Sequence, residues 1–173
     1  MISMNEDKDK LNYFIVDSTA IIHQFMLENE LKDNDLLLVP ELLEDELKSS
    51  ESKSVLTVLE AEDKIIKTAP SSESIEKISK IAMETGDISA LSKIDLHVLA
   101  LSLDFPDSVV YSDDNAVQNV CKKLNVKFQS FQFKIKHQRE YFWKCTVCRS
   151  KFTYKLDSCP DCGSSTKRYF KKK

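Results

Sequence analysis

The sequence predicts an α/β protein with a central parallel sheet, followed by a small C-terminal module of different character. Three observations lead to this prediction. Short apolar runs alternate with helical patterns through the first 130 residues, two C-x-x-C pairs stand near the end, and acidic and basic residues divide between the same two parts. Strands that alternate with helices are joined by crossovers, which produce a parallel sheet covered by helices on both faces.

Five apolar runs have the length of buried strands, and the segments between them have helical spacing or helix caps. The predicted strands are residues 13–16, 36–39, 64–69, 108–111 and 126–131. The predicted helices are residues 17–29, 41–48, 53–63, 71–86, 92–104 and 115–124. Pro40 suits the first turn of the helix that follows it, and Gly86 is placed to end another. In such a sheet the ligand site lies beyond the carboxyl ends of the strands.

Charge divides the chain close to residue 131. The 25 Lys and Arg and 28 Asp and Glu residues give a net charge of -3. Residues 1–130 carry a net charge of -12, whereas residues 131–173 carry +9 and hold 9 of the 15 aromatic residues. A clustered basic region attracts phosphate whatever the rest of the chain carries, so the C-terminal part predicts a nucleic-acid partner.

The same change of composition predicts three segments: a domain of residues 11–131, a flexible basic connector of residues 132–140 and a small module of residues 141–173. No apolar run approaches the roughly 18 residues of a membrane helix. The polar start MISMNEDKDK also lacks the apolar stretch of a secretory signal. We therefore expect a cytoplasmic protein without a membrane partner.

Four of the five cysteines form two C-x-x-C pairs separated by ten residues: Cys145, Cys148, Cys159 and Cys162. Two such turns that face each other supply the tetrahedral four-sulfur shell of a structural zinc ion. The alternatives are two disulfides, which need an oxidising compartment, and a redox pair, which leaves the other pair unexplained. We expect one structural Zn²⁺, because so short a module builds little core and needs the folding energy of a metal. Cys121 stands apart and is expected to be a buried core thiol.

Basic and aromatic residues surround these cysteines. The candidates for RNA contact are Lys144, Arg149, Lys151, Lys155, Lys167 and Arg168. Cations interleaved with aromatic rings contact phosphates and stack on bases. Some of the aromatic residues have a simpler explanation as the small core of the module.

Acidic residues fall where the predicted topology places a site. Asp17 directly follows the first strand, Asp114 follows the fourth, and Asp95 and Glu46 lie in helices. Each has a simpler explanation: Asp17 and Asp114 suit helix caps, and Glu46 suits a solvated helix face. Asp95 stands among apolar residues and needs a partner or a site. Converging carboxylates repel one another unless a divalent cation neutralises them, and oxygen ligands suit Mg²⁺ or Mn²⁺.

These motifs resemble those of a known family. The stretches YFIVDSTAII, ELLEDELK, SALSKIDLHVLAL and VVYSDDNAVQNV are similar, in order, to the acidic motifs of PIN-domain ribonucleases. The stretch ETGDISALSKIDLHVLAL, followed by a four-cysteine ribbon, resembles more closely the Nin-one-binding endonuclease family of small-subunit rRNA maturation, in its compact archaeal form. The resemblance extends from about Asn12 to Arg168.

The resemblance implies a PIN-like fold with a C-terminal zinc ribbon, and an Mg²⁺- or Mn²⁺-dependent endoribonuclease that cleaves at the 3′ end of the small-subunit rRNA precursor. The residues carried over as catalytic are Asp17, Glu46, Asp95 and Asp114, of which Asp17, Asp95 and Asp114 would bind the catalytic metal. The four paired cysteines match the zinc ligands. Asp45 competes with Glu46 for its role, and Asp113 competes with Asp114.

Two other functions stay open at this stage. The first is a toxin-like PIN ribonuclease that acts on other RNA, although such toxins usually lack a zinc ribbon. The second is a non-catalytic RNA-binding ribosome assembly factor whose acidic residues are only helix caps. A factor of that kind should bind no Mg²⁺ or Mn²⁺ through Asp17 and Asp95.

Overall fold

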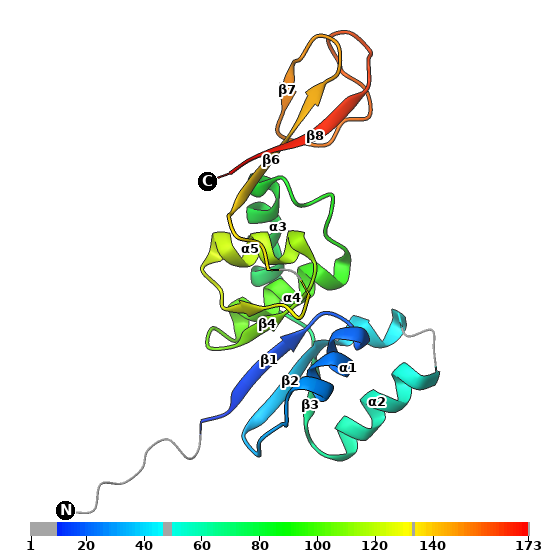
Figure 1. Ribbon diagram of the computed structural model, residues 1–173, viewed down its shortest axis with the longest axis vertical. Helices are drawn as coiled ribbons and strands as arrows, with labels where there is room; N and C mark the ends of the chain where they lie inside the picture. Colours follow the sequence, from blue (N-terminus) through cyan, green and yellow to red (C-terminus); the bar gives the residue numbers. More distant parts are fainter. Residues whose placement is uncertain (1–9, 47–49, 133, 173) are drawn as a thin grey trace, which may run out of the picture.

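The computed structural model describes residues 10–46, 50–132 and 134–172. Two sheets lie one after the other along its longest axis (Figure 1). The first has five strands and is flanked by helices, and the second has three strands and contains the paired cysteines. The predicted α/β fold with a central parallel sheet is confirmed.

All pairings in the first sheet are parallel, and the strand order is β3-β2-β1-β4-β5. The strands are β1 (Asn12–Val16), β2 (Asp35–Pro40), β3 (Ile65–Thr68), β4 (Val109–Tyr111) and β5 (Phe128–Gln129). The chain adds β2 and β3 on one side of β1 and then β4 and β5 on the other. The strand order therefore reverses between β1 and β4, and this is the place where open α/β sheets bind ligands.

The helices form two layers. They are α1 (Thr19–Glu28), the 3₁₀ helix η1 (Glu41–Glu46), α2 (Ser50–Ala61), α3 (Ser72–Thr85), α4 (Lys93–Asp104) and α5 (Asn115–Leu124). Helices α1 and α2 lie on one side of the strands, and α3, α4 and α5 gather on the other (Figure 1). Helix α4 packs against β1, β2 and β4, and its Val98, Leu99 and Leu101 are fully buried. Strand β2 and the ends of β1 and β4 are buried on both faces, which is why these strands read as continuous apolar runs.

Two predicted elements differ from the observed ones. The expected helix of residues 41–48 is a 3₁₀ helix that spans Glu41–Glu46, and residues 47–49 lie outside the described part of the chain. The helix begins at Glu41 as expected, but Pro40 is the last residue of β2, where it pairs with Thr68, and does not belong to the first helical turn. Strand β5 is shorter than expected, because β4 offers it only Val110 and Tyr111 as partners.

The C-terminal sheet is antiparallel, with the order β7-β6-β8. Its strands are β6 (Arg139–Cys145), β7 (Lys151–Phe152) and β8 (Thr166–Lys172). Trp143 is buried, Phe142 stacks on Tyr169, and Tyr141 packs against Phe170. These aromatic pairs join β6 to β8.

Buried amides of α5 hold the segment between the two sheets. The backbone N–H of Ile135 donates to Gln118 Oε1 at 2.8 Å. The backbone N–H of Arg139 donates to Asn119 Oδ1 at 2.6 Å, and Asn119 Nδ2 donates to the Arg139 carbonyl at 2.7 Å. The basic composition predicts a flexible connector, whereas the structure fixes it at two points, because an amide side chain without these partners would be costly to bury.

A second joint connects the ribbon to the loop after α3. The Arg168 guanidinium forms an ion pair with the buried Asp87 at 3.0 Å, donates to the Gly86 carbonyl at 2.9 Å and lies 3.6 Å from the centre of the Tyr141 ring. Asn119 also donates to Asp87. Gly86 has a φ of 75°, and a Cβ there would lie 2.6 Å from the Tyr141 carbonyl oxygen, so only glycine allows this approach.

No helix in the described ranges is long and apolar enough to cross a membrane.

Candidate active site and metal centre

Asp17 and the segment that contains Asp114 meet at the reversal of strand order. Asp17 follows β1 and Ser112 follows β4, and the last residues of these neighbouring strands, Val16 and Tyr111, are paired. Because parallel strands end at the same edge of a sheet, this register brings the two segments side by side. The topology therefore places Asp17 next to the start of α5, as the sequence predicts.

Asp17 has an electrostatic environment that disfavours its charged form. Burial raises its pKa from 3.8 to about 6, although hydrogen bonds from the Ser112 and Ser18 hydroxyls oppose this shift. The carboxylates of Asp95 and Asp114 raise the pKa of Asp17 further. Three acidic side chains from β1, α4 and α5 therefore interact at this edge, and a cation placed among them would relieve their repulsion.

Asp95 has a partner within its own helix. It forms a capping box at the start of α4, in which the Ser92 N–H donates to Asp95 Oδ2 at 2.7 Å and the Asp95 N–H donates to Ser92 Oγ at 3.2 Å. This box answers why an acidic residue is tolerated beside apolar neighbours. The hydrogen bond from Ser92 engages Oδ2, so a cation would bind Asp95 through Oδ1.

Asp114 is the N-cap of α5, so that part of the sequence prediction is confirmed. Its Oδ1 accepts hydrogen bonds from the backbone N–H groups of Ala116 at 2.6 Å and Val117 at 3.1 Å. A cap of this kind holds the carboxylate in one orientation. As in Asp95, the cap engages one carboxylate oxygen, here Oδ1, so the cap and a role in binding metal are compatible.

Asp113 has a different task. Its Oδ1 accepts hydrogen bonds from the backbone N–H groups of Phe131 at 2.8 Å and Gln132 at 3.0 Å. It therefore fixes the chain just after β5, at the start of the connector. These contacts separate the two neighbouring acids, and they favour Asp114 as the one that faces Asp17.

The position of Glu46 is described only in part. It is the last residue of η1, which follows β2 and so leaves the sheet at the same edge as Asp17. The side chain of Glu46 lies outside the described part of the structure. Its competitor Asp45 is exposed and lines a polar pocket of about 520 Å³ with Glu44 and Lys67.

Two residues near this edge were missed by the sequence analysis. Ser112 is buried, donates to Asp17 and accepts the N–H of Asp114 at 3.1 Å, so it connects the two acids. Ser112 could have been found from the sequence, because it stands between a predicted strand and the acidic pair Asp113 and Asp114. Lys67 at the end of β3 forms ion pairs with Glu44 at 2.9 Å and Glu60 at 2.5 Å, which tie η1 and α2 to the sheet.

The four paired cysteines converge much more tightly. Among the His, Cys, Asp and Glu side chains that the structure describes, which exclude Glu46, only these four bring three or more ligand atoms within 4.8 Å of one another. The Sγ atoms of Cys145 and Cys162 are 3.4 Å apart, and those of Cys148 and Cys159 are 3.5 Å apart. Zinc–sulfur bonds of about 2.3 Å put the sulfurs of a tetrahedron about 3.8 Å apart, so the cluster fits Zn²⁺.

The ribbon shifts the pKa values of two of these thiols in opposite directions. Hydrogen bonds from the Ser164 side chain and backbone lower the pKa of Cys162 to about 6, whereas burial raises that of Cys159 to about 11. Gly163, with a φ of 74°, makes the turn after the second pair. Cys121 lies apart in the main core as expected, and burial raises its pKa to about 12.

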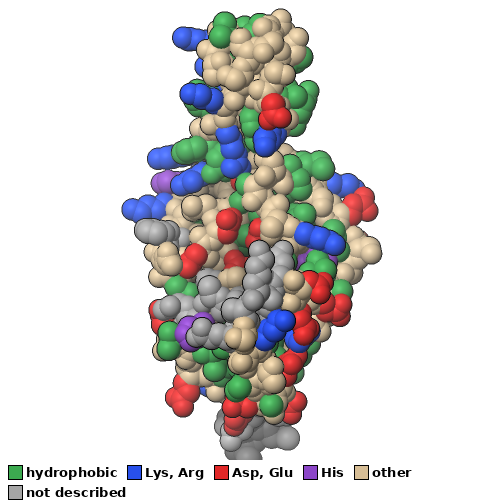
Figure 2. Space-filling view, turned by 90° about the vertical axis from the view of Figure 1, so that its right-hand side faces the viewer, with side chains coloured by type: hydrophobic (Ala, Val, Ile, Leu, Met, Phe, Trp, Pro, Cys, Tyr) green, Lys and Arg blue, Asp and Glu red, His purple; other side chains and the backbone are tan. Residues whose placement is uncertain are grey.

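The six candidates for RNA contact fall into two groups. Lys144, Arg149, Lys151, Lys155 and Lys167 are exposed or half-buried on the ribbon, and Lys151 lies 5.6 Å from the centre of the Phe142 ring. Arg168 instead directs its guanidinium at Asp87. In the face shown in Figure 2, Lys and Arg gather at the ribbon and at the neck, the narrower part of the molecule directly below the ribbon. Asp and Glu predominate farther down.

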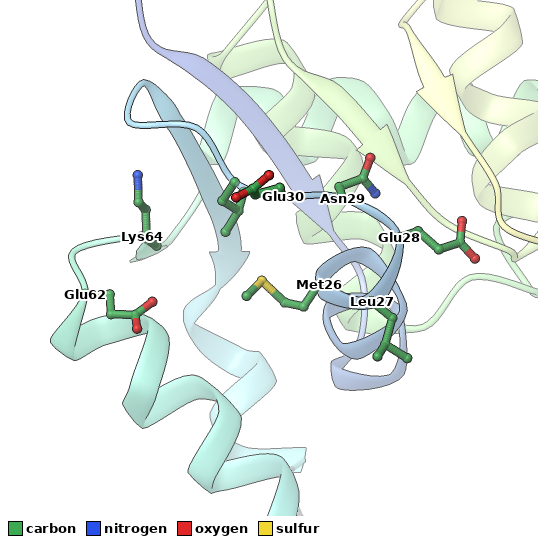
Figure 3. A pocket seen from close by; sticks show the side chains of 8 residues that line it. Met26, Leu27, Glu28, Asn29, Glu30, Glu62 and Lys64 are labelled. Atoms are coloured by element: carbon green, nitrogen blue, oxygen red, sulfur yellow. The ribbon is translucent and has the colours of Figure 1, made fainter.

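A separate pocket of about 400 Å³ lies at the other edge of the sheet (Figure 3). Met26, Leu27 and Glu28 line it from the end of α1, and Lys64 lines it from the segment that precedes β3. In this pocket Lys64 Nζ donates hydrogen bonds to the backbone carbonyls of Lys32 and Asp33. This pocket is remote from the edge of the sheet where Asp17, Asp95 and Asp114 interact, which we call the acidic edge. It holds none of the predicted site residues.

Residues 14–105 match the family model described as the PIN domain of ribonuclease. This segment runs from β1 through α4 and includes Asp17 and Asp95. The chain therefore belongs to the family of PIN-domain ribonucleases.

Its curated relatives make the likeness more particular. Endoribonuclease Nob1 of Pyrococcus abyssi is 38% identical over 119 residues, which span 68% of this chain and 73% of that protein. Endoribonuclease Nob1 of Methanocaldococcus jannaschii is 33% identical over 160 residues, spanning 89% and 76%. Ribonuclease VapC1 of Thermoplasma acidophilum is 30% identical over 161 residues, spanning 92% and 79%. The family resemblance of the sequence is thus confirmed.

Proposed function

We propose that this protein is a metal-dependent endoribonuclease that hydrolyses RNA phosphodiesters and matures the 3′ end of the small-subunit rRNA precursor. The observation that carries the proposal is the interaction of Asp17, Asp95 and Asp114 at the reversal of strand order. The names of the relatives, endoribonuclease Nob1 in two of the three, support RNA as the substrate.

In this proposal the three carboxylates hold Mg²⁺ or Mn²⁺. The donor set fits such an ion, because hard cations prefer carboxylate oxygens and an acidic group with a raised pKa gains from a nearby positive charge. When bound, the ion would polarise the phosphodiester and make water a better nucleophile at neutral pH. We assign Glu46 to orienting the water, on the strength of its place at the same edge.

The protein itself supplies the positioning. Ser112 holds Asp17 by its hydroxyl group, and the caps of α4 and α5 fix one oxygen each of Asp95 and Asp114. The remaining oxygens are then held in place before substrate binds, which lowers the cost of organising the site during the reaction. Hydrolysis joins the water oxygen to phosphorus and releases a ribose oxygen, which takes up a proton.

The ribbon supplies the second half of the function. One structural Zn²⁺ bound by Cys145, Cys148, Cys159 and Cys162 would hold its three strands together. Five of its candidate cations remain available to phosphate, with Arg168 engaged elsewhere. An rRNA precursor is a substrate large enough to contact the ribbon and the acidic edge at once.

A second candidate is a toxin-like ribonuclease that acts on other RNA, and the likeness to VapC1 over 92% of the chain favours it. The two candidates differ in substrate rather than in chemistry. They are separated by comparing cleavage of an RNA that spans the small-subunit 3′ junction with cleavage of unrelated structured RNAs of equal length. Preference for the junction supports the first candidate, and equal cleavage supports the second.

The test of the chemistry is Mn²⁺-dependent cleavage of the junction RNA by zinc-loaded protein. We expect Asp17→Asn to reduce the rate at least about a hundredfold, because even residues that only support metal ligands are worth about 10- to 100-fold. Asp33→Asn is the matched control, since Asp33 is exposed and lies at the other edge of the sheet. Undiminished cleavage by Asp17→Asn would overturn the assignment. A wild type that cleaves no RNA would instead favour the non-catalytic assembly factor.

A further inference from the structure

A basic pocket of about 410 Å³ lies where the connector meets α5 and the end of β8. Its lining consists of Asn115, Lys134, Ile135, Lys136, His137, Arg139 and Lys172, so four cations and a histidine face it and no acidic residue does. Figure 2 shows Lys and Arg side chains and a His gathered on one side of the neck below the ribbon. None of these residues is among the six ribbon candidates for RNA contact.

The pocket is built on a fixed backbone. Ile135 is buried and Gln118 holds its N–H, while Asn119 holds both the N–H and the carbonyl of Arg139. Gln118 and Asn119 are themselves fully buried in α5. Lys136 and His137 between these anchors therefore project from a segment that is already ordered, and a ligand would bind them without the cost of ordering the chain.

Two of the charges in this pocket lie opposite each other. Arg139 and Lys172 are direct partners in the register of β6 and β8, and like charges opposite each other destabilise a sheet. The neighbouring pair, Glu140 and Lys171, forms an ion pair at 3.2 Å. In the described part of the chain, none of the four cations of the pocket takes part in an ion pair.

The contacts that two of these cations do make leave their charge in place. Lys134 Nζ lies 5.2 Å from the centre of the Phe128 ring, and the Arg139 guanidinium lies 4.9 Å from that of Phe170. Arg139 also donates to the Tyr141 hydroxyl at 3.3 Å. Aromatic faces orient a cation without neutralising it, so the pocket keeps a concentrated positive potential that an anion would offset.

The pocket adjoins the acidic edge. Asn115, which lines it, is the first residue of α5 and directly follows Asp114. Asp113 fixes residues 131 and 132, so the connector starts at this edge and runs from it into the pocket. A strand whose phosphate lies at the acidic edge thus meets these cations next.

We propose that this pocket binds backbone phosphates of the RNA strand adjacent to the scissile phosphodiester. The identity of the ligand as RNA rests on the proposed function, whereas its character as a phosphodiester chain rests on the charge and position of the pocket. The pocket sets how the strand enters the acidic edge, and the ribbon contacts the RNA farther from the cleavage point.

The test measures RNA affinity against salt by fluorescence anisotropy, with full-length zinc-loaded protein carrying Asp17→Asn to prevent cleavage. The pocket pair is Lys136→Gln with Lys172→Gln, and the control pair is Lys77→Gln with Lys80→Gln on the exposed face of α3. For single strands each phosphate contact contributes about 0.7 to the slope of log K against log salt. The pocket pair should therefore lower the slope by about 1.4, and the control pair should leave it unchanged.

An unchanged slope in the pocket pair, or an equal loss in both pairs, would overturn the proposal. A poly-glutamate peptide that binds the wild type and not the pocket pair, while RNA binds both alike, would overturn it in favour of an acidic protein partner. Cleavage by the wild type is scored separately. If the wild type cleaves no RNA, the proposed function fails, and the salt slope still decides the role of the pocket.

Discussion

The two groups of potential metal ligands in this chain are organised in opposite ways. Four cysteines on two turns of the ribbon bring their sulfurs within 4.8 Å of one another. At the sheet edge burial is the main cause of the raised pKa of Asp17, and the carboxylates of Asp95 and Asp114 raise it further, yet these three side chains converge less tightly than the cysteines. A closed set of four thiols suits a structural ion, whereas an open set of carboxylates leaves room for water and substrate.

The difference follows from how each group is held. The turns of the ribbon force their thiols together because the chain between them is short, and thiols can meet without carrying charge. The acidic side chains come from β1, α4 and α5, and each is oriented by neighbours such as Ser112 or a cap. Removing zinc should therefore abolish the order of the ribbon, whereas removing a divalent cation from the acidic edge should leave the fold of the first sheet intact.

The largest expected effect is on the ribbon. We predict that stripping zinc, or replacing Cys159 by Ser, abolishes the order of β6 to β8, because structural zinc supplies about 10–16 kcal/mol in small zinc modules. The measurement is zinc stoichiometry together with hydrogen exchange of each strand. Cys121→Ala is the control, since it removes a buried thiol and should keep one zinc per chain. A ribbon that stays protected without zinc would contradict the comparison.

The two glycines test how the ribbon is joined to the first sheet. Both have a φ near 75°, so an alanine costs about 1–2 kcal/mol at either position. At Gly86 the new Cβ would also strike the Tyr141 carbonyl oxygen, which adds about 1–3 kcal/mol, whereas at Gly163 nothing lies within 4 Å. We predict that Gly86→Ala lowers the free energy of unfolding more, and raises hydrogen exchange at β6. Equal effects of the two variants would show that the close approach of Gly86 to Tyr141 does not stabilise the attachment of the ribbon.

The raised pKa of Asp17 should make the free energy of unfolding depend on pH. The pKa of Asp17 is about 6 in the folded protein and about 3.8 when unfolded, so the unfolded chain loses this proton first and stability falls as pH rises between these values. Asp17→Asn removes that penalty and should stabilise metal-free sites by up to about 3 kcal/mol at pH 7, with little gain at pH 3.5.

Denaturant unfolding of zinc-loaded protein without added divalent ions measures this gain. Added Mg²⁺ should then stabilise the wild type and leave Asp17→Asn unchanged. Asp33→Asn is again the control. A gain of equal size at both pH values would show that burial of the charged form is not its source.

The smallest expected effect concerns Arg168. We predict that Arg168→Met lowers the free energy of unfolding by about 2 kcal/mol, because it leaves the carboxylate of Asp87 buried without its cation. The cost is below that of a fully buried pair, since about a third of the Arg168 side chain is exposed (32%). Lys167→Met is the control. If Arg168→Met lowered RNA affinity and left stability unchanged, Arg168 would instead be an RNA-contacting residue.

Features encoded within a few residues could be predicted from the sequence. The C-x-x-C spacing defines the cysteine cluster, and the cap at Asp114 follows from its place between a strand and a helix. The partner of Asp95 was also readable, because Ser92 stands three residues earlier, the spacing of a capping box.

Features that join distant segments could not be predicted. Arg168 reads as one more cation of a basic ribbon, because its partner Asp87 is 81 residues away in the sequence. The basic pocket depends on the register that brings Lys172 opposite Arg139, and on two amides of α5 that hold the connector. Composition alone describes that segment as loose, since it does not reveal buried partners.

The account depends most on the acidic edge binding a divalent cation. The most direct measurement is anomalous scattering from crystals of zinc-loaded protein soaked in Mn²⁺, for the wild type and Asp17→Asn. We predict a manganese peak among Asp17, Asp95 and Asp114 in the wild type, and none there in the variant. A wild-type crystal with zinc in the ribbon and no manganese at the acidic edge would contradict the central claim.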